Sequence, residues 1–305
     1  MTPAQLQAKA LRWQAAATPA VLVEVSAARG SVPRGDGTRM LVSADTVQGT
    51  IGGGHLELQA IEAARGLLRG AVGERLQHVA LGPSLGQCCG GALDLRYTPL
   101  QAVDANNWTL PPPRFTLQLY GAGHVGRAIV KLLADIDCRV HWIDERETEF
   151  PSGLLPPHIE RLCVEPVDAE VAKAAAGSCF LVLTHSHDLD LRITQAVLAR
   201  GDFAWFGLIG SATKRARFES RLRHRGVNDA LLARMVCPIG LPGIRGKEPS
   251  VIALAVVAQL LTLAPGPLPQ LRDDARRAVR VSQLPAAGRP LQPADALTTR
   301  SNNPQ

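Results

Sequence analysis

The sequence predicts an α/β protein in which an N-terminal, mainly antiparallel α+β domain is followed by a Rossmann-like domain with a parallel sheet. Two observations support this fold class. Residues 21–97 contain short strand-like segments separated by Gly, Pro and Asp turns, a pattern typical of antiparallel sheets. Residues 115–241 instead alternate strand-like and helix-like segments, which is typical of a parallel sheet with crossover helices.

The N-terminal domain is predicted over residues 1–100. Its first twenty residues read as a short amphipathic helix, and its strand candidates are VLVEVSAA, TRMLVSAD, TVQGTI, ERLQHVAL and ALDLRY. After the glycine run GGG, apolar residues recur at a helical spacing from Leu56 to Leu68. We therefore expect one helix to cover a face of this sheet.

A linker is predicted over residues 101–114, because two asparagines and three consecutive prolines fit neither a helix nor a sheet interior. The Rossmann-like domain follows over residues 115–264, with strands at FTLQLY, CRVHWID, CFLVLTH and FAWFGLIG, and a further candidate at MVCPIGL. Residues 265–305 are rich in proline and polar side chains with little apolar periodicity, which predicts a disordered tail.

The composition restricts the classes of function. The chain has 305 residues and a formal charge of +6, but few aromatic residues and no single basic stripe, so nucleic-acid binding is disfavoured. The most apolar stretch, residues 251–263, is too short to cross a membrane and suits a buried or subunit-interface helix. No export signal is recognised and six cysteines lack a secreted framework spacing, so we expect a cytoplasmic protein with reduced thiols.

The segment GAGHVG is a candidate phosphate-binding turn. Gly121, Gly123 and Gly126 form G-x-G-x-x-G between a predicted strand and a predicted helix, and Asp144 ends the next strand. The first glycine permits a tight turn, the second lets a pyrophosphate approach, and the third packs helix on strand. Asp144 would bind ribose hydroxyls, although neighbouring Arg146 could favour an extra phosphate. The alternative is a purely architectural turn.

Two glycine-rich segments of the first domain are candidate anion sites. ARGSVPRGDGTRMLV places Arg29, Arg34 and Arg39 in a flexible window, where planar guanidinium groups could clamp phosphate or carboxylate oxygens. A simple hairpin loop explains the glycines equally well. In GTIGGGHLE, Gly52, Gly53 and Gly54 precede a helix whose N–H groups favour anions, unless Glu57 caps that terminus instead.

The segment GQCCGG is the most unusual one. Cys88, Cys89, Gly90 and Gly91 lie between two predicted strands, and adjacent cysteines do not have zinc-finger spacing. A thiolate beside flexible glycine backbone is a good soft ligand for a thiolate-seeking metal. A pair of buried structural cysteines is the alternative.

Two segments of the second domain have a functional and a structural interpretation. THSHDLDL follows a strand, so its histidines and aspartates could bind a divalent metal, or Asp188 and Asp190 could cap the next helix. TKRARFESRLRHRG is a basic helix, and a solvated face is the first interpretation, ahead of docking to an acidic partner or a phosphate.

In this order, the motifs resemble a known family. RGSVPRGDGTRMLV, GTIGGGHLE, GQCCGG, GAGHVG, THSHDLDL, GLIGSATKRARF and PIGLPGIRGKEPSVIALAVVAQLL are together similar to the XdhC/CoxI family of xanthine dehydrogenase accessory proteins. The resemblance covers residues 21–261 and says nothing about the tail. It maps the family's cysteine motif onto Cys88 and Cys89, its arginine–glycine loop onto residues 29–39, and its Rossmann turn onto residues 121–126.

The resemblance implies a chaperone rather than an enzyme, with no catalytic residues. Such a protein binds the molybdenum cofactor (a molybdopterin), protects it while a cysteine desulfurase supports its sulfuration, and inserts it into the apo molybdenum subunit of xanthine dehydrogenase. It also implies a homodimer that works with cofactor biosynthesis proteins. Cys89 is the expected molybdenum ligand, and the Rossmann-like domain could hold a nucleotide. The main alternative is an NAD(P)-dependent oxidoreductase that uses the GAGHVG turn.

Overall fold

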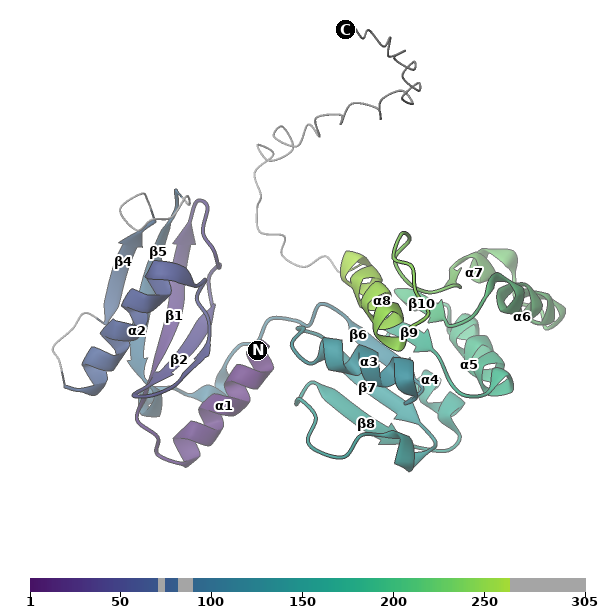
Figure 1. The fold of residues 1–305 in the computed structure, drawn as a ribbon, viewed down its shortest axis with the longest axis horizontal. Coiled ribbons are helices and arrows are strands. Elements are labelled where there is room, and N and C mark those ends of the chain that lie inside the picture. The colour runs from purple at the N-terminus through teal and green to yellow at the C-terminus, as the bar shows by residue number, and fades with distance from the viewer. Residues whose placement is uncertain (71–74, 82–89, 264–305) are drawn as a thin grey trace, which may run out of the picture. The chain divides into compact units, whose positions relative to one another are not determined.

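The computed structural model describes residues 1–70, 75–81 and 90–263. Within these ranges it contains one antiparallel and one parallel sheet, which confirms the predicted fold class (Figure 1). The predicted tail over residues 265–305 lies outside the described residues.

The antiparallel sheet has the strand order β3-β2-β1-β5-β4. Its strands are β1 (Ala20–Arg29), β2 (Arg39–Ser43), β3 (Val47–Gly49), β4 (Leu76–Ala80) and β5 (Ala92–Pro99). All five correspond to predicted segments.

Two helices cover opposite faces of this sheet. Alternate residues of each strand point to opposite faces, and the face bearing Val23 and Leu95 packs against α2 (Gly54–Leu68). The other face, with Leu22 and Leu41, packs against α1 (Pro3–Ala15). Thr2 caps the start of this helix through a capping box. The start of the predicted linker joins this second core, since Leu100 and Ala105 are buried there.

The parallel sheet has the strand order β11-β10-β9-β6-β7-β8. Its strands are β6 (Thr116–Tyr120), β7 (Arg139–Asp144), β8 (Ile159–Cys163), β9 (Cys179–Val182), β10 (Trp205–Leu208) and β11 (Met235–Val236). The order reverses between β6 and β9, so the carboxyl ends of these two strands flank the crevice where doubly wound sheets bind ligands.

Helices cover both faces of the parallel sheet (Figure 1). One face packs against α3 (His124–Leu133) and α8 (Pro249–Leu263), which also contact each other. The other face packs against α5 (His187–Arg200), α6 (Ala212–His224) and the short α4 (Glu170–Lys173) and α7 (Asp229–Ala233). Among the described residues, no helix is long and apolar enough to cross a membrane.

Candidate functional site

The GAGHVG turn lies at the carboxyl end of β6, and the structure explains each of its three glycines differently. A Cβ on Gly121, whose φ is +120°, would overlap the carbonyl oxygen of Leu183, and a Cβ on Gly126 would overlap that of Gly121. At Gly123 φ is −68°, and an added Cβ would meet no atom within 4 Å. The fold therefore requires Gly121 and Gly126, whereas Gly123 leaves open space at the start of α3.

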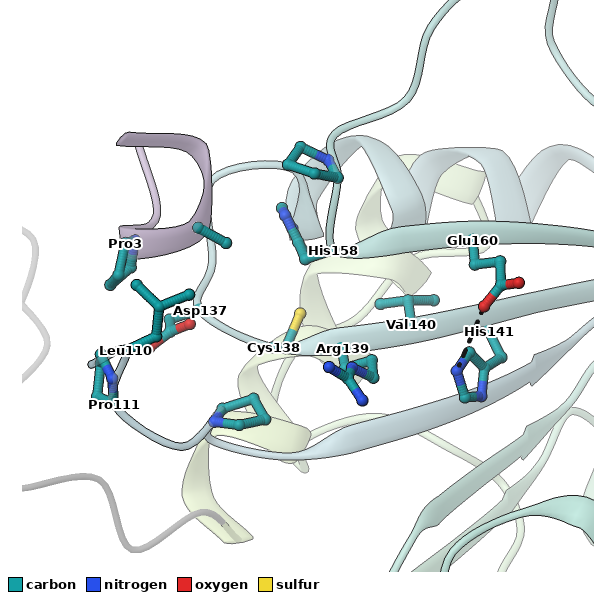
Figure 2. Close-up of a pocket in the computed structure, with 13 residues that line it drawn as sticks. Pro3, Leu110, Pro111, Asp137, Cys138, Arg139, Val140, His141, His158 and Glu160 are labelled. Carbon is teal, nitrogen blue, oxygen red and sulfur yellow. Dashed lines mark ion pairs between the residues drawn. The ribbon is translucent and has the colours of Figure 1, made fainter. Parts of the chain in front are cut away.

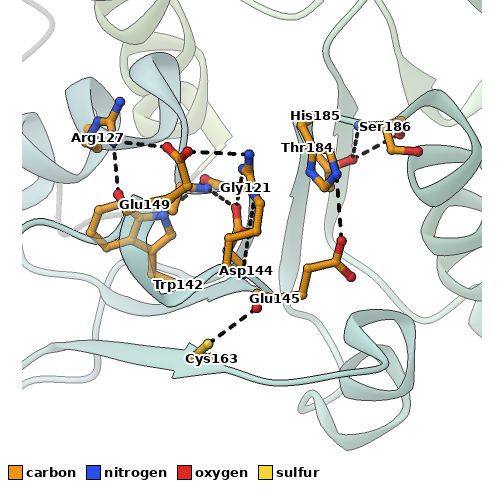
Figure 3. Close-up of polar contacts among 12 residues, drawn as sticks. Gly121, Arg127, Trp142, Asp144, Glu145, Glu149, Cys163, Thr184, His185 and Ser186 are labelled. Atoms are coloured by element: carbon orange, nitrogen blue, oxygen red, sulfur yellow. Dashed lines mark hydrogen bonds and ion pairs between the residues drawn. The ribbon is translucent and has the colours of Figure 1, made fainter.

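Asp144 is buried behind this turn rather than open to a ligand (Figure 3). Its Oδ2 accepts the Ala122 N–H at 2.7 Å and Nη2 of Arg146 at 3.0 Å, while Oδ1 accepts the backbone N–H and Nε of Arg146, both at 3.0 Å. A carboxylate has about four acceptor positions, so these four donors fill it. Ribose hydroxyls would find no free oxygen here, which differs from the predicted contact.

Opposing effects set the charge of Asp144. Burial raises the pKa of its carboxyl, but the hydrogen bonds from Arg146 and from the backbone N–H groups of Ala122 and Arg146 hold the net pKa below its ordinary value. The carboxylate is thus ionised and anchors the loop after β7 to the turn after β6. Arg146 also faces Glu149, at 3.5 Å, so its charge is balanced within the protein.

The loops after β9 and β10 are joined by a buried ion pair. Asp190, on α5, accepts the backbone N–H and hydroxyl of Thr184 at 3.0 and 2.7 Å through Oδ1, and Nζ of Lys214 at 2.5 Å through Oδ2. Lys214 also donates to the carbonyl of Ile209 at 2.9 Å. THSHDLDL and GLIGSATKRARF, which are separate motifs in the sequence, therefore meet at the carboxyl edge of the sheet.

The start of α5 fits neither capping by an aspartate nor the predicted metal cluster in THSHDLDL. The cap of α5 is Ser186, whose side chain accepts the Leu189 N–H, and not Asp188 or Asp190. His185 lies 3.7 Å from Glu145, measured from Nε2 to Oε1 (Figure 3). Over residues 1–70, 75–81 and 90–263, no group of three or more His, Cys, Asp or Glu side chains could hold a metal.

In the N-terminal sheet, the arginine–glycine loop contacts both other glycine motifs. A Cβ on Gly91 would lie 2.5 Å from the carbonyl oxygens of Arg29 and Ser31, and a Cβ on Gly52 would lie 2.6 Å from Cβ of Pro33. The loop after β1, the turn after β3 and the segment before β5 thus meet at one end of the sheet. Cys88 and Cys89 themselves lie outside the described residues.

The three arginines of this loop have different surroundings. Arg29 pairs with Asp94 at 3.2 Å, Arg39 pairs with Glu24 at 2.8 Å, and the Arg39 guanidinium lies 4.8 Å from the ring centroid of Trp108. Arg34 is exposed, and within the part of the chain that is described it has no carboxylate or aromatic partner. The structure therefore separates two arginines that pair with carboxylates from one that has no such partner among the described residues.

The glycine run at the start of α2 is explained by backbone geometry and capping. Gly52, Gly53 and Gly54 all have positive φ, at 132°, 79° and 65°, which favours glycine. Oε2 of Glu57 accepts the N–H groups of Ile51 and Gly53 at 3.1 Å and the Thr50 hydroxyl. These contacts of Glu57 match the capping alternative for the turn before α2, and the anion site at the start of the helix stays a prediction.

A hollow of about 360 Å³ lies at the opposite edge of the parallel sheet (Figure 2). His141, His158 and Glu160 line it at the amino ends of β7 and β8, and His141 lies 3.7 Å from Glu160. Burial raises the pKa of the neighbouring Cys138 thiol to about 12, so that thiol is protonated. Because open α/β sheets bind ligands at the carboxyl ends of their strands, we do not place the functional site here.

Comparison with known families agrees with the two halves of the structure. The model described as the XdhC Rossmann domain matches residues 117–260, and that of the XdhC and CoxI family matches residues 13–79. The chain belongs to the XdhC and CoxI family. This membership confirms the resemblance that the motif order predicted.

Two relatives place this family member among known proteins. The uncharacterized protein YqeB of Escherichia coli (strain K12) is 31% identical, over 82% of this chain and 45% of its own length, so the chain spans less than half of that relative. A crystal structure from Bacillus halodurans, described as a xanthine dehydrogenase, is 18% identical with a TM-score of 0.64, over 93% of this chain and 98% of that one. At that identity the likeness concerns the fold alone.

Proposed function

We propose that this XdhC and CoxI family member is an accessory protein that binds the molybdenum cofactor, holds it during sulfuration and delivers it to apo xanthine dehydrogenase. The observation that carries the proposal is the meeting of the arginine–glycine loop with Gly52 and Gly91 at one end of the antiparallel sheet. Family membership supports a role in the maturation of xanthine-dehydrogenase-type enzymes.

The residues at this end of the sheet suit the chemistry of such a cargo. The cofactor carries a dithiolene-bound metal and a phosphate; thiolates are ligands for soft metals, and guanidinium groups bind phosphate oxygens. Gly91 follows the two cysteines in the sequence and lies against the arginine–glycine loop, and this contact supports a shared role for the two motifs. We assign molybdenum binding to Cys89, with Cys88 as its neighbour or alternate.

Binding and transfer of a cargo need no turnover. The cysteine desulfurase, the cofactor biosynthesis proteins and the apo molybdenum subunit are the partners that this role requires, and we propose that the protein acts as a homodimer. The open space at Gly123 supports a nucleotide or another phosphate-bearing ligand in the Rossmann half. That ligand would be held without hydride transfer.

Purification from cells that make the cofactor tests the proposal. We expect the wild-type protein to carry molybdenum and pterin, measured by metal analysis and by pterin fluorescence after oxidation. The double change of Cys88 and Cys89 to Ala should abolish both signals while the melting temperature stays near wild type. A double variant that keeps full pterin and metal and still activates the apoenzyme would show that the cysteines are structural.

The two single variants assign the ligand. Cys89→Ala should reproduce the loss of molybdenum, and Cys88→Ala should retain part of it. If Cys88→Ala alone reproduces the whole loss, the assignment to Cys89 is wrong while the site itself stands. Wild-type protein that carries neither pterin nor molybdenum would refute the proposed function.

A further inference from the structure

We infer that Arg34, alone among the three arginines of its loop, is the residue that binds a phosphate group, and that Arg29 and Arg39 hold the loop in place. As applied to the cargo, this inference rests on the proposed function. It names the chemical class of ligand group, a phosphomonoester, and the one side chain that recognises it.

The first step is the pairing of the other two arginines. Arg29 shares the carboxylate of Asp94 with His78, whose Nδ1 lies 2.6 Å from Oδ1 of Asp94. Hydrogen bonding to His78, together with the charges of Arg29 and His78, keeps the pKa of Asp94 below its ordinary value despite partial desolvation, so the carboxylate is ionised. The charge of Arg29 is therefore balanced by a carboxylate of β5, although the Arg29 side chain is itself exposed.

Arg39 makes more contacts within the protein than Arg29 does. Its Nη2 lies 2.8 Å from Oε1 of Glu24, its Nε donates to the same oxygen at 2.9 Å, and Nη1 donates to the carbonyl of Thr109 at 3.4 Å. Its guanidinium also lies over Trp108. An arginine held by a carboxylate, a carbonyl and a ring has little capacity left for a ligand.

The second step is the rigidity of the loop around Arg34. Two backbone hydrogen bonds cross the base of the loop: the Val25 N–H donates to the carbonyl of Thr38 at 2.9 Å, and the Gly37 N–H donates to the carbonyl of Val25 at 2.8 Å. The hydroxyl of Thr38 donates to the carbonyl of Gly35 at 2.7 Å and closes the turn after Arg34.

Glycine contacts fix the two flanks of the same loop. The segment before Arg34 packs against Gly91, and Pro33 packs against Gly52. The stem of Arg34 itself runs past Gly52, with Cγ 3.8 Å from where a Cβ of that glycine would lie. A guanidinium on a preorganised segment loses less freedom when it binds an anion, which favours affinity. Glu57 already accepts the N–H groups of Ile51 and Gly53 just before α2, so these two donors are not part of the site.

The experiment compares Arg34→Ala and Arg34→Lys with Arg69→Ala. Arg69 is an exposed arginine at the opposite end of α2, so its removal controls for the loss of one positive charge. From cofactor-making cells, Arg34→Ala should carry about tenfold less pterin, as expected for a lost charge-assisted hydrogen bond. Its melting temperature should match wild type. Arg34→Lys should rescue only part, because lysine lacks the planar fork, and Arg69→Ala should carry the full amount.

Inorganic phosphate provides a second readout that does not depend on the cargo. Phosphate should raise the melting temperature of wild-type and Arg69→Ala protein but not that of Arg34→Ala. If wild type carries no pterin yet shows this Arg34-dependent shift, the proposed function fails and the phosphate site stands. If Arg34→Ala keeps the wild-type phosphate shift, or keeps full pterin where wild type carries it, the inference is overturned.

Discussion

A buried carboxylate, Asp144, holds the turn after β6 and the loop after β7 in one arrangement. It accepts hydrogen bonds from Ala122 on the first loop and from Arg146 on the second. Because its net pKa is lowered in the folded state, its contribution to stability is present above the pKa of the unfolded chain, about 3.9. That contribution is lost as the pH falls through the lower folded pKa.

We predict that Asp144→Asn destabilises the protein most at neutral pH. The difference in free energy of unfolding between wild type and variant should be constant from pH 7 to about 5 and should narrow below about pH 4. Urea denaturation at a series of pH values measures it. Asp188→Asn, which changes a largely exposed carboxylate, is the control and should show little difference. A pH-independent difference for Asp144→Asn would contradict the assigned charge.

Breaking the Asp190–Lys214 pair is predicted to cause a large loss in the free energy of unfolding. Both side chains are largely buried, at 1% and 11% exposure, and removing one partner leaves an uncompensated charge. Lys214→Met should therefore lower the free energy of unfolding by about 3–5 kcal/mol. Arg221→Met removes an exposed pair with Asp188 and should cost about 0–1 kcal/mol. Equal effects in the two variants would show that Asp190 does not depend on Lys214.

At the scale of elements, most strands and helices could be predicted because their apolar periodicity is strong. The strand β8 was not predicted, since only Ile159 of its residues is fully buried and its edge position leaves charged side chains exposed. MVCPIGL forms a strand of two residues only, because Pro238 cannot donate a ladder hydrogen bond. Long-range partners, such as Lys214 for Asp190, leave no local pattern in a sequence.

Alanine substitutions in the GAGHVG turn test which of its three glycines the fold requires. Gly121→Ala and Gly126→Ala should each lower the melting temperature by several degrees, because each added Cβ overlaps a backbone carbonyl. Gly123→Ala should melt as wild type does, since its φ is ordinary and its surroundings are open. Thermal denaturation followed by circular dichroism checks all three. A Gly123→Ala variant that melts as low as Gly126→Ala would show that the fold also requires this glycine.

For the whole molecule, the two proposed anion-binding regions belong to two different sheets. The first is the end of the antiparallel sheet where Arg34 lies, and the second is the carboxyl edge of the parallel sheet at Gly123. The candidate motifs were recognisable from sequence, but the role that we propose for each of their residues was not. It depends on which arginine finds a carboxylate and which glycine has space around it, and only the fold determines both.

The last prediction is that the two regions act on different ligands and that neither catalyses sustained hydride transfer. Arg34→Ala should lower bound pterin and leave any binding of NADH or NADPH, measured by fluorescence titration, unchanged. Gly123→Ala should do the reverse, because a Cβ there would fill the space through which a pyrophosphate approaches. Steady oxidation of NADH by wild type over many turnovers, lost in Gly123→Ala, would instead favour the oxidoreductase alternative. The physical reason to expect no turnover is that Asp190 and Lys214, a buried titratable pair at this edge, are already bonded to each other and to Thr184 and Ile209. A pair held in this way is suited to fixing two loops and offers no free acid or base.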